Sequence, residues 1–172
     1  GWVLPVDAEI LLVSDTEQRA RDAVVWLRRV GLDKVTGYLN GGMFAWARAG
    51  LPTEHVAQLS AHELHEMACS TEPMTLVDVR SPAEFEALHI EGAVNIPAPD
   101  LRTRHSELPK DAPIALTCST GHRSSLAASI LLRNGHKGLR NVAGGMSGYN
   151  AAGYAGECPM CVVPHGPHFT GR

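Results

Sequence analysis

The sequence of 172 residues has few aromatic side chains, 5% of the total, and a net charge of only -3. This charge gives no electrostatic reason to expect nucleic acid or an acidic membrane as a partner. No apolar run approaches the roughly 20 residues that a membrane span needs, and no secretory leader is visible. Gly1 is not a native start, so we expect the natural N-terminus to lie upstream.

Cysteine is also scarce. The four cysteines, Cys69, Cys118, Cys158 and Cys161, are too few and too unevenly spaced for a disulfide scaffold. One of them, Cys118, lies in a loop whose chemistry depends on a free thiol, which favours a reducing compartment. We therefore expect a cytoplasmic protein, and we expect it to need no cofactor.

Cys118 lies between two segments of different periodicity. Residues 114–117 are apolar and strand-like, whereas residues 125–133 are helix-like. A thiol on a tight loop between a strand and a helix N-terminus faces backbone amides, which favour the thiolate. The basic side chains of His122 and Arg123 add to that field. The pattern predicts a reactive cysteine rather than a buried structural one.

The chain contains one pattern twice. Residues 10–50 and residues 114–149 both read as strand, loop, helix, strand, Gly-Gly-Met and short helix. Aligning the two predicted helices places Ser14 opposite Cys118. A hydroxyl cannot carry sulfur as a thiolate does, so we expect the first copy to be inactive. In that copy we expect Trp26 to belong to the core.

The second copy has an upstream half that the first lacks. Ser60 and Ser81 each precede a glutamate by three residues, which is typical of a helix N-terminus. Residues 74–79 are β-prone, and residues 89–97 read as a turn and a strand. This alternation predicts an α/β fold with a parallel sheet and helices on both faces. Ligand sites of such folds lie at the carboxyl ends of strands, where Cys118 and residues 78–80 fall.

Several motifs in this order resemble the rhodanese-like sulfurtransferases. The residues that carry the resemblance are Leu76-Val77-Asp78-Val79-Arg80, Glu84-Phe85, residues 89–97, Cys118 to Ser124 and Gly144-Gly145-Met146. The resemblance implies a rhodanese-like fold with three parts. Residues 1–54 are the C-terminal half of a degenerate, inactive rhodanese domain, residues 55–156 are an active domain, and residues 157–172 are a tail. This order resembles the C-terminal part of fusions with a persulfide dioxygenase of metallo-β-lactamase fold.

The resemblance implies sulfur transfer from thiosulfate or a persulfide to a thiol or cyanide, with the sulfur carried as a persulfide on Cys118. The expected substrate-binding residues are Ser119, Thr120, Gly121, His122, Arg123 and Ser124, and the expected supporting residues are Asp78 and Arg80. Arg123 has two possible roles at this point. It binds the anionic end of thiosulfate, or it pairs with Asp78 and holds the loop.

Two other functions remain open. A phosphatase or arsenate reductase of the same fold needs five residues between its cysteine and arginine, but only four separate Cys118 from Arg123. A persulfide-carrying sensor or interaction module with low turnover would retain the same loop. Formation of thiocyanate from thiosulfate separates an enzyme from such a module.

Two regions have no assigned chemistry. The tail holds Cys158, Cys161, His165 and His168, which suit zinc, a redox pair or a plain docking segment, and we expect no metal. Residues 1–54 have apolar faces that need cover. We expect them to pack on a missing segment of the parent chain or on another copy, and we expect neither nucleic acid nor membrane as a partner.

Overall fold

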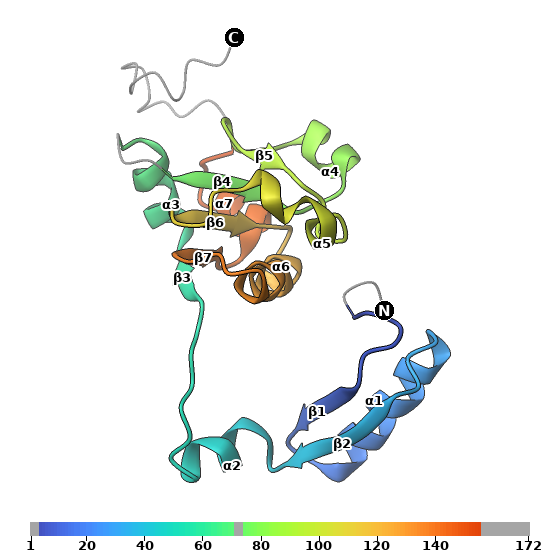
Figure 1. Cartoon of the computed structure of the whole chain (residues 1–172). Coiled ribbons are helices and arrows are strands. Elements are labelled where there is room, and N and C mark those ends of the chain that lie inside the picture. The colour runs from blue at the N-terminus through green and yellow to red at the C-terminus, as the bar shows by residue number, and fades with distance from the viewer. Residues whose placement is uncertain (1–3, 71–73, 156–172) are drawn as a thin grey trace. The chain divides into compact units, whose positions relative to one another are not determined.

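The computed structural model describes residues 4–70 and 74–155, which form two compact units (Figure 1). One unit comprises Gly1–His55 and the other Val56–Arg172. The tail cysteines and histidines of the sequence analysis lie outside the described residues. Within the described part of the chain, no helix combines the length and the apolar character that crossing a membrane requires.

The first unit is a β-α-β-α segment. Its elements are β1 (Ile10–Ser14), α1 (Glu17–Arg29), β2 (Val35–Asn40) and α2 (Gly42–Arg48). The two strands pair in parallel to make a two-stranded sheet. Helix α1 begins at Thr16, whose side chain accepts a hydrogen bond from the amide of Arg19. The predicted order of elements is the observed one.

The apolar faces of this first unit lie open. Leu11 on β1 is 76% exposed, and Trp26 on α1 is 63% exposed. The expectation that Trp26 belongs to the core was therefore wrong. Its counterpart in the second copy, Ile130, is buried on a helix that packs against α5 (Leu101–Arg104), and the described residues of the first unit include no helix that corresponds to α5. That other protein covers these faces stays a prediction.

The second unit has a five-stranded sheet with helices on both faces. Its elements are β3 (Ala57–Leu59), α3 (Ala61–Ala68), β4 (Thr75–Asp78), α4 (Pro82–Ala87), β5 (Val94–Asn95), α5, a 3-10 turn (His105–Glu107), β6 (Ile114–Thr117), α6 (His122–Arg133), β7 (Leu139–Val142) and α7 (Gly145–Ala151). The strand order is β3-β7-β6-β4-β5, and every neighbouring pair is parallel. The predicted α/β class, with a parallel sheet and helices on both faces, is confirmed.

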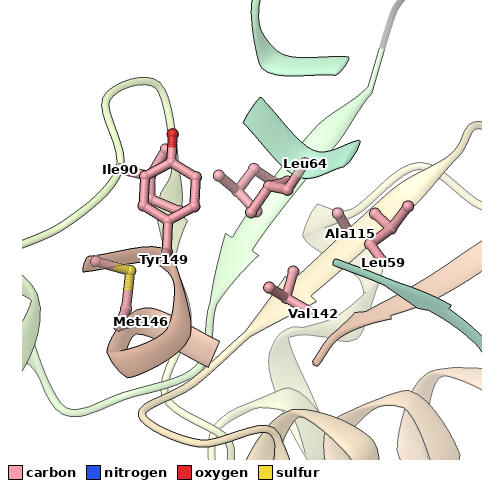
Figure 2. Packing of buried hydrophobic residues seen from close by; sticks show 8 residues of the cluster. Leu59, Leu64, Ile90, Ala115, Val142, Met146 and Tyr149 are labelled. Carbon is pink, nitrogen blue, oxygen red and sulfur yellow. The ribbon is translucent and has the colours of Figure 1, made fainter. Parts of the chain in front are cut away.

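A hydrophobic cluster fixes α3 and α7 to one face of this sheet (Figure 2). Leu64 of α3 and Tyr149 of α7 pack over Leu76, Ala115 and Val142 of the strands. Helices α5 and α6 pack together, and α6 lies against β6 and β7. Because successive side chains of a strand point to opposite faces, Ile114 and Leu116 are buried on the other side of β6 from Ala115.

In both copies the last helix is preceded by a turn with the same backbone conformation. Gly41 and Gly42 have φ values of 75° and 56°, and Gly144 and Gly145 have 74° and 54°. A Cβ atom at Gly145 would lie 2.2 Å from the carbonyl oxygen of Cys118. At Gly42 it would lie 3.3 Å from the carbonyl carbon of Ser14. In each copy the turn therefore lies against the end of the first strand, β1 or β6, which places Ser14 where the second copy has Cys118.

Candidate active site

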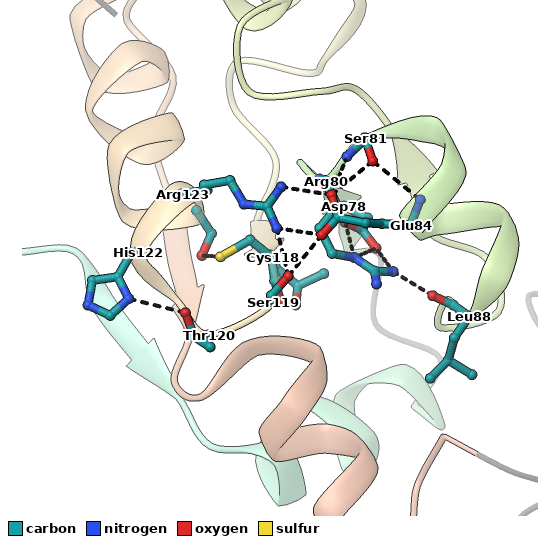
Figure 3. A network of polar contacts seen from close by, with 12 residues as sticks. Asp78, Arg80, Ser81, Glu84, Leu88, Cys118, Ser119, Thr120, His122 and Arg123 are labelled. Carbon is teal, nitrogen blue, oxygen red and sulfur yellow. Dashed lines mark hydrogen bonds and ion pairs between the residues drawn. The ribbon is translucent and has the colours of Figure 1, made fainter. Parts of the chain in front are cut away.

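Cys118 follows β6, the central strand of the sheet, and lies under the N-terminus of α6 (Figure 3). The helix begins at His122, three residues earlier than the sequence pattern indicated. Gly121 makes this early start possible, because it is the N-terminal cap and has a φ of 100°, which other residues rarely adopt. The amides of the first helical turn are thereby brought to the loop that holds the thiol.

The sulfur of Cys118 receives hydrogen bonds from this loop. The amide of Gly121 donates to Sγ at 3.1 Å, and the hydroxyl of Ser124 donates at 3.4 Å. The side chain is buried, and burial raises the pKa of the thiol. The bonds from the hydroxyl and amide of Ser124 and from the amides of Thr120 and Gly121 lower it by more. The pKa of Cys118 therefore lies below its ordinary value, and the site favours a thiolate.

A second helix N-terminus holds the backbone of the loop. The amide of Met146 in α7 donates to the carbonyl oxygen of Cys118 at 2.7 Å, and the amide of Ser147 donates to that of Ser119 at 3.0 Å. Amides of the loop and of the first turn of α6 thus donate to the sulfur, while those of α7 satisfy carbonyl groups of the same loop. The α7 amides thus hold the loop in place, and the amides that face the sulfur remain available to it.

Arg123 pairs with Glu84 and not with Asp78, so one of the two roles left open for Arg123, the pairing with Asp78, is not observed. Its Nη1 and Nη2 atoms donate to the two carboxylate oxygens of Glu84 at 2.9 and 2.6 Å, and Nη2 also donates to the Ser119 hydroxyl at 2.6 Å. The guanidinium holds the pKa of Glu84 far below its usual range. The cation of the loop is therefore neutralised by a fixed carboxylate in this structure.

Asp78 instead pairs with Arg80, two residues along. Both side chains are buried, and Arg80 donates through Nε and Nη2 to the Asp78 carboxylate at 2.6–3.0 Å. Asn95 of β5 ties the same segment together, because its Nδ2 donates to the carbonyl oxygens of Asp78 and Arg80. Asp78 and Arg80 thus hold the end of β4, which lies beside β6. Their supporting role in the site stays a prediction.

Glu84 is a residue of the site that the sequence analysis assigned only to a helix cap. It accepts from the amide and hydroxyl of Ser81 at the start of α4, and it also holds Arg123 and Ser119. His122 lies at the other side of the loop, with its Nδ1 3.1 Å from the Thr120 hydroxyl. The loop therefore has an ion pair on the side of Glu84 and a contact between a hydroxyl and an imidazole on the side of Thr120.

A cysteine surrounded by loop amides after a central parallel strand defines a class of proteins in which the thiolate is a nucleophile or a group carrier. The model of the rhodanese-like domain matches residues 60–152. The chain belongs to the rhodanese-like family.

Similar proteins cover different shares of this chain. Uncharacterized protein YqhL of Bacillus subtilis is 46% identical over 70 residues, 41% of this chain and 56% of its own length. A protein named Sulfurtransferase from Allochromatium vinosum is 33% identical over 91 residues, 53% of this chain and 85% of its own length. The crystal structure of a rhodanese-related protein from Thermoplasma volcanium has a TM-score of 0.52 at 31% identity, covering 57% of this chain and 94% of that one. The chain thus spans little more than half the length of YqhL.

The hydroxyl of Ser124 gives the first testable prediction. Replacing Ser124 by alanine removes a hydrogen bond to the thiolate, so the pKa of Cys118 rises. The thiolate is then protonated at a higher pH than in the wild type. The pH at which iodoacetamide alkylates Cys118 at half the maximal rate therefore moves upward. Alkylation rates measured by mass spectrometry against pH test this. The exposed Ser106→Ala variant is the control, and an unshifted midpoint in Ser124→Ala would contradict the assignment.

Proposed function

We propose that the chain is a sulfurtransferase that carries a sulfane sulfur as a persulfide on Cys118, with thiosulfate or a low-molecular-weight persulfide as the donor. The observation that supports it most is the hydrogen bonding of Sγ by the Gly121 amide and the Ser124 hydroxyl. These donors stabilise a negative sulfur in a buried place. The name of the Allochromatium relative agrees with this chemistry.

The proposed reaction has two displacement steps. The Cys118 thiolate attacks the outer sulfur of thiosulfate, the Sγ–S bond forms, and the bond to the sulfonate breaks with its electron pair leaving on sulfite. An acceptor such as cyanide or a thiolate then attacks the terminal sulfur of the persulfide. The Sγ–S bond breaks, and its electron pair returns to Sγ. The amides of residues 119–124 stabilise the negative charge on sulfur both in the Cys118 thiolate and in the Cys118 persulfide.

Intact mass spectrometry tests the first step. After exposure to thiosulfate, the chain is expected to gain the mass of one sulfur atom, and cyanide is expected to remove it and release thiocyanate. Proteolytic mapping should place the added sulfur on Cys118. A chain that gains no sulfur from thiosulfate or from an organic persulfide, or gains it on another cysteine, would contradict the proposal.

The pairing of Arg123 with Glu84 allows the donor to be tested. If thiosulfate is the donor and Arg123 binds its sulfonate, the guanidinium must leave Glu84 to do so. Glu84→Gln removes the competing charge, so the KM for thiosulfate should fall by about threefold or more, whereas Arg123→Ala should raise it. Steady-state thiocyanate formation gives both values. A KM that moves in neither variant, with lower thermal stability, would assign the pair to holding the loop alone.

A further inference from the structure

A groove of about 530 Å³ lies beside the catalytic loop. It shares Thr120, Gly121 and His122 with the loop, and Figure 3 places Thr120 and His122 on the side of Cys118 that faces away from Glu84. Gly121 connects the groove to the sulfur, because its amide is the one that donates to Sγ at 3.1 Å. A molecule in this groove therefore lies next to the residues that hold the reacting atom.

The wall of the groove carries hydrogen-bonding groups, and its one titratable side chain is the imidazole of His122. Gln58 of β3, Asn141 of β7 and Ser125 and Ser129 of α6 face it, and none of its lining residues is Lys, Arg, Asp or Glu. Such a wall does not suit a dianion such as thiosulfate, which calls for cations. The volume falls in the range of sites for small organic molecules, roughly 300–1,000 Å³.

Asn141 is incompletely satisfied within this wall. Its side chain is buried at 5% exposure, and its Nδ2 donates to the Oε1 of Gln58 at 2.9 Å. The Nε2 of Gln58 donates in turn to the carbonyl oxygen of Val56. The Oδ1 of Asn141 has no partner among the described residues. A buried carbonyl oxygen without a donor is costly, and an N–H group from a bound molecule would satisfy it after a small rotation of the side chain.

We propose that this groove binds the body of an uncharged, amide-bearing thiol that serves as the sulfur acceptor. The two side-chain amides offer the donors and acceptors that peptide-like groups require, and the hydroxyls of α6 extend the same chemistry along the groove. This inference rests on the proposed function and names the class of its acceptor. The acceptor thiolate attacks the terminal sulfur of the persulfide, a new S–S bond forms, and the electron pair of the broken bond returns to Sγ.

The test compares two acceptors of different size. Pantetheine is an uncharged thiol with two amides, and 2-mercaptoethanol is an uncharged thiol with none. With persulfide-loaded full-length chain, pantetheine should have a kcat/KM at least about tenfold higher. Ser129→Trp places an indole in the groove and should remove most of this preference. Gln58→Ala, on the exposed edge strand, should reduce it by about threefold or more.

The matched control lies on the same helix. Leu132 of α6 is 46% exposed and does not line the groove, so Leu132→Trp should keep the preference for pantetheine. Equal rates for the two acceptors in the wild type would overturn the inference. So would a preference that survives both Ser129→Trp and Gln58→Ala.

A binding experiment separates this inference from the proposed function. In the Cys118→Ser chain, pantetheine should shift the side-chain amide resonances of Gln58 and Asn141 in NMR spectra, and no sulfur transfer is involved. Shifts confined to other residues, or none at the concentrations that saturate transfer, would overturn the inference. If Cys118 takes up no sulfur while these resonances shift, the proposed function fails and the groove assignment stands.

Discussion

Replacing Cys118 by serine is expected to reduce sulfur transfer from thiosulfate to cyanide by several orders of magnitude while leaving the fold intact. The hydroxyl of serine fits the space of the buried thiol and still accepts hydrogen bonds from Gly121 and Ser124. It does not form a stable sulfur adduct, because an alcohol remains protonated where a thiol ionises. Thiocyanate formation measures the activity, and circular dichroism measures the fold.

The other described cysteine provides the control. Cys69 is half-buried at the end of α3, far along the chain from the loop, and Cys69→Ser should retain the wild-type rate. A Cys118→Ser chain that kept about a tenth of the activity would show that another group carries the sulfur. In that case the tail cysteines Cys158 and Cys161 become the next positions to replace.

Replacing Gly145 by alanine is expected to cause the largest loss of stability in the second unit. An added Cβ would lie 2.2 Å from the carbonyl oxygen of Cys118 and 2.7 Å from the carbonyl carbon of Ser119. The backbone at both positions belongs to the loop that holds Cys118, so neither position can move without disturbing the candidate site. We expect a loss of about 3 kcal/mol or more in the free energy of unfolding, together with loss of sulfur transfer.

A control substitution at Gly153 distinguishes this steric clash from backbone strain alone. Gly153 also has a positive φ, 84°, but nothing lies within 4 Å of the position of its Cβ, so Gly153→Ala should cost about 1 kcal/mol. All three tryptophans lie in the first 55 residues. Tryptophan fluorescence therefore does not report on this unit, and hydrogen exchange at the amides of β6 is the suitable measurement. Equal losses of unfolding free energy in Gly145→Ala and Gly153→Ala would contradict the proposed clash at Gly145.

Local signals in the sequence predicted the elements of the fold well. Ser60 and Ser81 form the capping boxes that their spacing to glutamate indicated, because such a motif depends only on residues three apart. The alternation of strands and helices then determined a parallel sheet, and the strand that precedes Cys118 became its centre. The start of α6 was misjudged because Gly121 allowed the chain to enter the helix within the loop.

The polar network of the site was harder to predict because its members are distant in sequence. Glu84 and Arg123 are 39 positions apart, and nothing local indicates that a helix-capping carboxylate also binds the loop cation. Pairing of Asp78 with Arg123 was one of two open alternatives, but Arg80 is closer along the chain and pairs with the buried Asp78 carboxylate. Trp26 was misjudged for a different reason. An apolar position on an amphipathic helix predicts burial only where a covering element exists.

The paired glycines before α2 and α7 have a consequence for how such chains are recognised. The first copy keeps the left-handed pair Gly41 and Gly42 although it carries Ser14 at the place of the thiol. The pair is therefore required by the close approach of two backbones and not by sulfur chemistry. A search for further copies of this fold would therefore do better to follow this Gly-Gly turn and its spacing from the first strand of the copy than to follow the cysteine, which residues 10–50 lack.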